Sequence, residues 1–126
     1  MVHITARTPC HPTEDREKVR TALLNIFPEG QIEELDEGFM SSGDSGERLR
    51  QMILDEHIRD TARSVMLRGM LDGRTTFRLN KQVAYVGKLS FQEGSSPLGN
   101  IEVTVEDEDI KAVIDHLAES TVEGAE

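Results

Sequence analysis

The stretch RTTFRLNKQVAYVGKLSF, residues 74–91, carries the pattern that most constrains the fold. Apolar and polar side chains alternate along it, and the same alternation returns at 101–105, which is typical of half-buried antiparallel strands. We therefore predict three consecutive antiparallel strands between Arg74 and Val105. Tyr85 is placed in the core with the side chains predicted to face the helices, which are Phe77, Leu79, Val83, Leu89, Ile101 and Val103.

Residues on the N-terminal side predict a strand, a helix and a hairpin. Residues 3–8 are rich in β-branched types and precede two prolines, so they indicate a first strand. Thr13 is expected to cap a helix that ends before Pro28-Glu29-Gly30. Residues 31–35 and 39–42 are then expected to pair as a hairpin around Asp36-Glu37-Gly38.

Two further helical regions are predicted, one before and one after the three strands. Residues 46–70 show apolar side chains at helical spacing and form either one bent helix or two in succession, with Asp44 as the cap. Residues 94–99 are expected to form a loop. Asp107 is predicted to cap a last helix, and the tail from residue 120 has nothing to pack against.

These elements define the predicted fold class. The order β-α-ββ-α(α)-βββ-α indicates a single α+β domain over residues 1–119, with a frayed tail at 120–126. A chain of 126 residues has room for one core. The predicted architecture is an antiparallel sheet with helices packed on one of its faces.

The composition limits the function classes. The formal net charge is -10, which indicates either an acidic protein or one adapted to a salty cytoplasm. No apolar run approaches the ~20 residues needed to cross a bilayer, so we expect no membrane contact. Cys10 is the single cysteine, which favours a reducing, cytoplasmic setting.

One segment departs from this acidity. Residues 57–91 carry seven Lys or Arg and two acids, a net of +5, whereas the flanking regions are strongly acidic. Such a surface suits phosphate groups. The candidate RNA-binding residues are Arg59, Arg63, Arg74, Arg78, Asn80, Lys81, Gln82 and Lys88.

The same bases have a purely structural explanation that stays open. Lys88 can pair with Glu102 or Glu106 on a neighbouring strand, and the whole cluster can serve ion pairs within the fold. If the cluster serves RNA, its bases are expected to form one contiguous surface, with Lys81 in a turn between two strands. A placement of Tyr85 in the core would leave no exposed aromatic ring for base stacking.

No residue set indicates catalysis or a bound metal. Cys10 and His11 are adjacent, but the remaining histidines show no paired zinc spacing. The four histidines also give no evident nucleophile–base pair. We expect no catalytic residue, no metal and no cofactor, and an enzymatic function ranks behind a binding function.

Several short blocks are distinctive: PTED (12–15), NIFP (25–28), IRDTAR (58–63), LRG (67–69), LNKQ (79–82), AYVG (84–87) and SPLG (96–99). Together they resemble the uncharacterised protein family 0201 of archaea. The resemblance implies an archaeal cytosolic protein. It also implies a fold similar to the ribosomal large-subunit protein that carries the smallest ribosomal RNA, and no established activity.

The sequence therefore supports two hypotheses about function. The first is a non-catalytic RNA-binding or ribonucleoprotein-associated domain that uses a basic patch between residues 59 and 88. The second is a protein-interaction module, in homodimeric form or with another partner, in which the arginines pair with acids of that partner.

Overall fold

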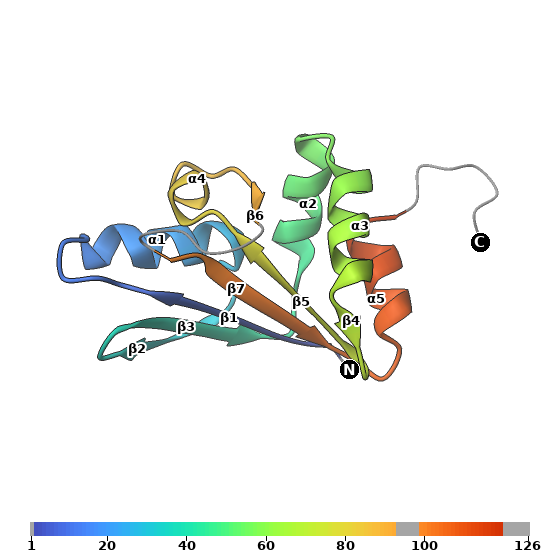
Figure 1. The fold of residues 1–126 in the computed structure, drawn as a ribbon, viewed down its shortest axis with the longest axis horizontal. Coiled ribbons are helices and arrows are strands. Elements are labelled where there is room, and N and C mark those ends of the chain that lie inside the picture. Colours follow the sequence, from blue (N-terminus) through green and yellow to red (C-terminus); the bar gives the residue numbers. More distant parts are fainter. Residues whose placement is uncertain (1, 93–98, 120–126) are drawn as a thin grey trace.

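The computed structural model describes residues 2–92 and 99–119, and Figure 1 shows their arrangement. The strands are β1 (His3–Pro9), β2 (Gln31–Leu35), β3 (Gly38–Gly43), β4 (Met70–Leu71), β5 (Arg74–Leu79), β6 (Phe91–Gln92) and β7 (Ile101–Glu106). The helices are α1 (Arg16–Ile26), α2 (Glu47–Asp55), α3 (Arg59–Arg68), α4 (Lys81–Tyr85) and α5 (Ile110–Leu117). The predicted loop at 94–99 largely, and the predicted frayed tail at 120–126 entirely, lie outside the described residues.

The strands form one antiparallel sheet in the order β2-β3-β1-β7-β5-β4, and β6 pairs with the far end of β5. The five helices of the described residues lie on the same side of this sheet (Figure 1). Ile4, Phe77 and Val103 are buried under the helices, and their neighbours in the strand alternate toward the opposite side. The predicted α+β class, with helices on one face of an antiparallel sheet, is confirmed.

The first half of the chain follows its sequence pattern closely. The strand at 3–8 is β1, and the predicted hairpin is the β2–β3 pair, in register from Gln31 opposite Ser42 to Leu35 opposite Gly38. Of the two possibilities for residues 46–70, the structure has two helices. His57 takes a positive φ of 56° between them, which ends the first helix before the second begins.

The middle strand of the predicted three is wrong. Residues 81–85 form α4, and only the last residue of the predicted strand, Phe91, pairs with β5, together with Gln92 beyond it. Asn80 caps α4, because its Oδ1 accepts a hydrogen bond of 2.9 Å from the Val83 N–H. Gly87, with a φ of +80°, follows the helix. Capping at one end and a left-handed glycine beyond the other outweigh the alternating pattern.

Because residues 81–85 are helical, the predicted positions of two side chains are also wrong. Tyr85 is 41% exposed and lies on the surface of α4, not in the core. Lys81 is the first residue of α4 and is buried, so it does not lie in a turn between strands. The predicted caps also differ at other helices: Asp15, Gly46 and Asp109 hold the N-cap positions expected for Thr13, Asp44 and Asp107.

Candidate nucleic-acid interface

The two predicted arginines of α3 face another helix. The Arg59 Nη1 donates to Glu119 Oε1 at 3.2 Å, and the Arg63 Nη1 donates to Asp115 Oδ1 at 2.6 Å and to the Ala118 carbonyl at 3.2 Å. The hydrogen bond from Arg63 holds the pKa of Asp115 below its usual value. These arginines join α3 to α5 and its C-terminal end within the helical layer.

Lys81 forms a buried ion pair. Its Nζ lies 3.0 Å and 3.1 Å from the two carboxylate oxygens of Glu14, and it also donates to the Pro9 carbonyl at 2.7 Å. Burial raises the pKa of Glu14, but the His11 backbone N–H and the Lys81 ammonium together lower it below its usual value. Lys81 therefore holds α4 against the segment after β1, and its ammonium is not presented to an external phosphate.

Three other predicted RNA-binding residues lie at or near α4. One of them has a structural role, and the other two are exposed. Asn80 is committed to capping α4, as described above. Gln82 and Lys88 are exposed, on the helix and just after it. Lys88 does not lie on a strand, so it has no cross-strand position opposite Glu102 or Glu106.

Arg74 and Arg78 lie on the side of the sheet that none of the described helices covers, and we call this side the open face. Its members alternate with the buried strand residues. They are His3, Thr5, Arg7, Pro9, Gln31, Glu33, Leu35, Gly38, Met40, Ser42, Leu71, Arg74, Thr76, Arg78, Gln92, Glu102, Thr104 and Glu106.

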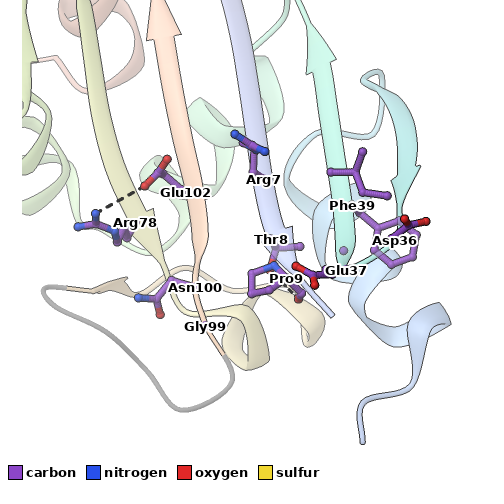
Figure 2. Close-up of a pocket in the computed structure, with 12 residues that line it drawn as sticks. Arg7, Thr8, Pro9, Asp36, Glu37, Phe39, Arg78, Gly99, Asn100 and Glu102 are labelled. Carbon is purple, nitrogen blue, oxygen red and sulfur yellow. Dashed lines mark hydrogen bonds and ion pairs between the residues drawn. The ribbon is translucent and has the colours of Figure 1, made fainter. Parts of the chain in front are cut away.

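Arg7, Glu102 and Arg78 form one cross-strand row on the open face. Arg7 pairs in register with Glu102, and Glu102 pairs in register with Arg78, so the acid lies between two arginines. Arg78 Nη2 is 3.5 Å from Glu102 Oε2, and both side chains are about half exposed. Arg7 forms no ion pair with the residues that the structure describes, and Figure 2 shows a dashed contact to Glu102 from Arg78 but none from Arg7.

A second row of the open face is uncharged and rich in hydroxyl groups. Ser42, Thr5, Thr104 and Thr76 are successive cross-strand neighbours from β3 to β5. The hydroxyl oxygens of Thr76 and Thr104 are 3.4 Å apart. Hydroxyl groups both donate and accept hydrogen bonds, so this row can contact phosphate or ribose oxygens.

The arginine row ends in an open hollow of about 910 Å³ (Figure 2). Arg7, Arg78 and Glu102 line one part of it, and Asp36 and Glu37, from the β2–β3 turn, line another. Phe39 belongs to the same lining, although its buried side chain packs under Arg16 of α1. The hollow therefore presents both cations and acids, and it is not a uniformly positive site.

The predicted residues do not form one contiguous surface. Arg59 and Arg63 belong to the helical layer, Lys81 is buried, and Arg74 and Arg78 lie beyond the sheet on its open face. Sequence reasoning missed Arg7, which falls outside the basic segment. The alternation of residues 3–8 was the available signal, because it places Arg7 on the face opposite Ile4 and Ala6.

The fold and this surface define a class: an α+β domain with an antiparallel sheet covered on one face only. A family model described as RNA binding matches residues 3–114. A UPF0201 protein of Methanothermobacter thermautotrophicus is 39% identical over 121 residues, which cover 94% of this chain and 92% of that protein. The chain belongs to the UPF0201 family of archaea.

Two further comparisons bear on the fold and on the family's organisation. The crystal structure of a UPF0201 protein from Methanococcus jannaschii matches with a TM-score of 0.87 at 35% identity, covering 97% of this chain and 96% of that one. A UPF0200/UPF0201 protein of Archaeoglobus fulgidus is 37% identical over 126 residues, and these are only 39% of its length.

The described residues lack both a membrane-spanning helix and a cluster of metal ligands. None of the helices within 2–92 and 99–119 has the length and apolar character needed to cross a membrane. Across those same ranges, no cluster of three or more His, Cys, Asp or Glu side chains is placed to hold a metal ion.

Proposed function

We propose that this protein is a non-catalytic RNA-binding domain and that the open face of its sheet contacts the RNA. The observation that carries the proposal is the arginine row Arg7–Glu102–Arg78, with Arg74, beside a row of hydroxyl groups on a face that no helix covers. The description of the family model as RNA binding supports the same function.

Charge supports the open face over the rest of the surface. The chain carries a net charge of -10, which repels a polyanion. The strand positions of the open face hold three arginines (Arg7, Arg74, Arg78) and three glutamates (Glu33, Glu102, Glu106), so this face is close to neutral. Near neutrality weakens the repulsion, and the guanidinium groups then supply charge-assisted hydrogen bonds to phosphates.

A large polyanion on this face would also change the arginine row. Arg78 forms an ion pair with Glu102 at 3.5 Å, and this pair is long and exposed to solvent. Such a pair contributes little to stability, so its arginine can exchange the carboxylate for a phosphate at small cost. Arg7 needs no such exchange, since it has no ion-pair partner among the described residues.

The experiment compares two double variants with equal charge change. Arg7→Glu/Arg78→Glu reverses the open-face arginines, and Arg20→Glu/Arg48→Glu reverses two exposed arginines of α1 and α2 on the helical side. Binding of total cellular RNA is measured for both and for the wild type over a range of salt concentrations. We expect the open-face variant to lose affinity and the control to retain most of it.

The salt dependence gives a second readout. Each phosphate contact adds about -0.7 to the log–log slope on single strands, so loss of two contacts should flatten the slope by about 1.4. An equal loss of RNA affinity in the two double variants would show that the effect depends only on net charge. It would contradict RNA binding by the open face. No binding by the wild type at any salt concentration would contradict RNA binding itself.

A protein-interaction module is the second candidate, and one observation favours it. The Archaeoglobus fulgidus relative joins a segment similar to this domain to a longer remainder within one chain. Segments joined in one chain lie at high effective concentration and often interact. Sedimentation of the wild type and of Arg78→Glu without RNA tests the homodimeric form: a dimer that the substitution dissociates would support this candidate over the first.

A further inference from the structure

A groove between α1 and α4 exposes the chain's single tyrosine. Tyr85 is 41% exposed and Val86, beside it, is 65% exposed, on the helical side of the molecule and away from the open face. Lys18 and Gln82 line the groove with Tyr85, Lys88 follows Val86 two residues later in the chain, and all three of these polar side chains are exposed. We call these five residues the Tyr85 ledge.

The ledge is held rigidly although α4 is only five residues long. The Asn25 side-chain amide donates to the carbonyls of Ala84 and Tyr85 at 2.9 Å and 3.0 Å, which satisfies the C-terminal end of α4 from α1. Ala84 is fully buried against α1. The buried Lys81–Glu14 ion pair fixes the other end of α4.

The groove at the ledge has the size and lining of a small stacking site. Its volume is about 210 Å³, and Lys18, Val19, Gln82 and Tyr85 contribute to its walls. The Lys18 ammonium lies 5.7 Å from the centroid of the Tyr85 ring, a cation–π distance. The Tyr85 hydroxyl forms no hydrogen bond with any residue in the described ranges.

The charges on the ledge favour an anionic ligand. Of the two acids in the groove, Glu14 is paired with Lys81, and Asp15 caps α1 by accepting a hydrogen bond from the Glu17 N–H. Lys18 remains as a positive charge beside the ring, and Lys88 is a second exposed positive charge three residues after Tyr85 in the chain. An aromatic face with lysines and a side-chain amide is the combination that binds a base, its phosphate and its polar edge.

We propose that the Tyr85 ledge binds an unpaired RNA nucleotide, whose base stacks on Tyr85 while Lys18 and Lys88 contact the flanking phosphates. This inference rests on the proposed RNA-binding function and specifies the substrate class: RNA with a single-stranded segment. A continuous duplex keeps its bases stacked within the helix and cannot offer one to the ring. The open face and the ledge then contact different parts of one folded RNA.

The composition allows a direct measurement. The chain has one tyrosine and no tryptophan, so its intrinsic fluorescence comes from Tyr85. We would titrate the wild type with an oligouridylate and with an abasic oligoribose phosphate of equal length. Stacking should quench the emission with the oligouridylate, after correction for its absorbance, and should leave it nearly unchanged with the abasic oligomer. Equal responses would contradict stacking.

Substitutions give an independent test. Tyr85→Ala should weaken binding to the oligouridylate by about five- to a hundredfold, the range measured when a stacking aromatic is removed. Tyr85→Phe should retain most of the affinity, because the ring remains. Met70→Ala is the matched control, since Met70 is a similarly exposed apolar side chain on β4, at 38%.

The outcomes separate this inference from the proposed function. If the wild type binds RNA and Tyr85→Ala binds it equally well, nucleotide binding at the Tyr85 ledge is contradicted. The proposal that the open face binds RNA is then unaffected. Absence of any RNA binding by the wild type would contradict both. A loss of affinity in Tyr85→Ala and Met70→Ala alike would assign the effect to general surface change and overturn the role of the ledge.

Discussion

Lys81 and Arg78 are three residues apart and carry the same charge, but they lie in opposite environments. The Lys81 side chain is 5% exposed and its ammonium contacts Glu14 and the Pro9 carbonyl at about 3 Å or less. The Arg78 side chain is 49% exposed and reaches Glu102 only at 3.5 Å. The first base stabilises the fold, and the second is available for a ligand.

The cause of the difference is the change of element at residue 80. Arg78 is on β5, where alternation turns it to the open face. The chain then enters α4, whose first residue, Lys81, contacts Pro9 at the end of β1 and Glu14 in the segment before α1. A basic segment in sequence is thus not a basic patch in space, and each base has to be judged by its own burial and partners.

The largest expected loss of stability follows substitution of Lys81. Lys81→Met should lower the free energy of unfolding by about 3–5 kcal/mol, because the Glu14 carboxylate stays buried without its partner. Glu14→Gln/Lys81→Met should recover much of this loss, since no charge is then buried. Urea denaturation of the three proteins measures both changes. A loss below about 1 kcal/mol in the single variant would contradict a structural role for this pair.

The same pair predicts a pH dependence. The pKa of Glu14 is lowered in the folded state and has its ordinary value of 4.5 in the unfolded state. The unfolded chain therefore binds more protons at acidic pH, so the stabilisation is complete above about pH 4.5 and is lost as the pH falls through the folded pKa. Denaturation at several pH values should show a steeper loss in the wild type than in Glu14→Gln/Lys81→Met.

A smaller change in the free energy of unfolding is expected for Arg63, whose exposure lies between those of Lys81 and Arg78. Arg63 is 17% exposed, and its guanidinium contacts Asp115 and the Ala118 carbonyl. Arg63→Ala should cost about 1 kcal/mol, since Asp115 is itself half exposed and remains solvated. Its RNA affinity should equal that of the wild type. Weaker RNA binding by a fully folded Arg63→Ala would place the α3 arginines back in the RNA site.

The smallest effect on stability is expected at Arg78. Arg78→Gln removes a long, exposed ion pair, so the free energy of unfolding should change by less than about 0.5 kcal/mol. Its RNA affinity should nevertheless fall, because a phosphate contact is lost. Thermal denaturation and RNA binding measured on the same protein separate the two effects. A stability loss above about 1 kcal/mol with unchanged RNA affinity would reverse the comparison with Lys81.

Most of the fold could be predicted because its signals are local. Strand alternation places Thr75, Phe77 and Leu79 on one side of β5, and helical spacing gives the buried stripe of α5. The run at 81–91 failed because Val83, Tyr85 and Leu89 alternate as in a strand, while Lys81 and Ala84 are buried at helical spacing. A five-residue helix is too short for its period to outweigh such an alternation.

The candidate site was predictable only in part. Arg74 and Arg78 could be placed by alternation within their own strand, but Arg7 comes from a strand 67 positions away from Arg74 in the sequence. The partners of Arg59 and Arg63 are as remote, at positions 119 and 115. Side-chain partners of this kind depend on how helices and strands pack, which no local pattern encodes.

The amino-acid sequence by itself determined the α+β class, the N-terminal strand, helix and hairpin, and the acidity with its one basic segment, because periodicity and composition are local properties. Only the tertiary structure decided which bases are buried and which are exposed. Burial depends on contacts between distant segments, such as Lys81 with Glu14 and α3 with α5. Because of those contacts, the bases of one basic segment have three different roles. Lys81 forms a stabilising ion pair, Arg59 and Arg63 join α3 to the α5 end of the chain, and Arg74 and Arg78 are exposed on the sheet.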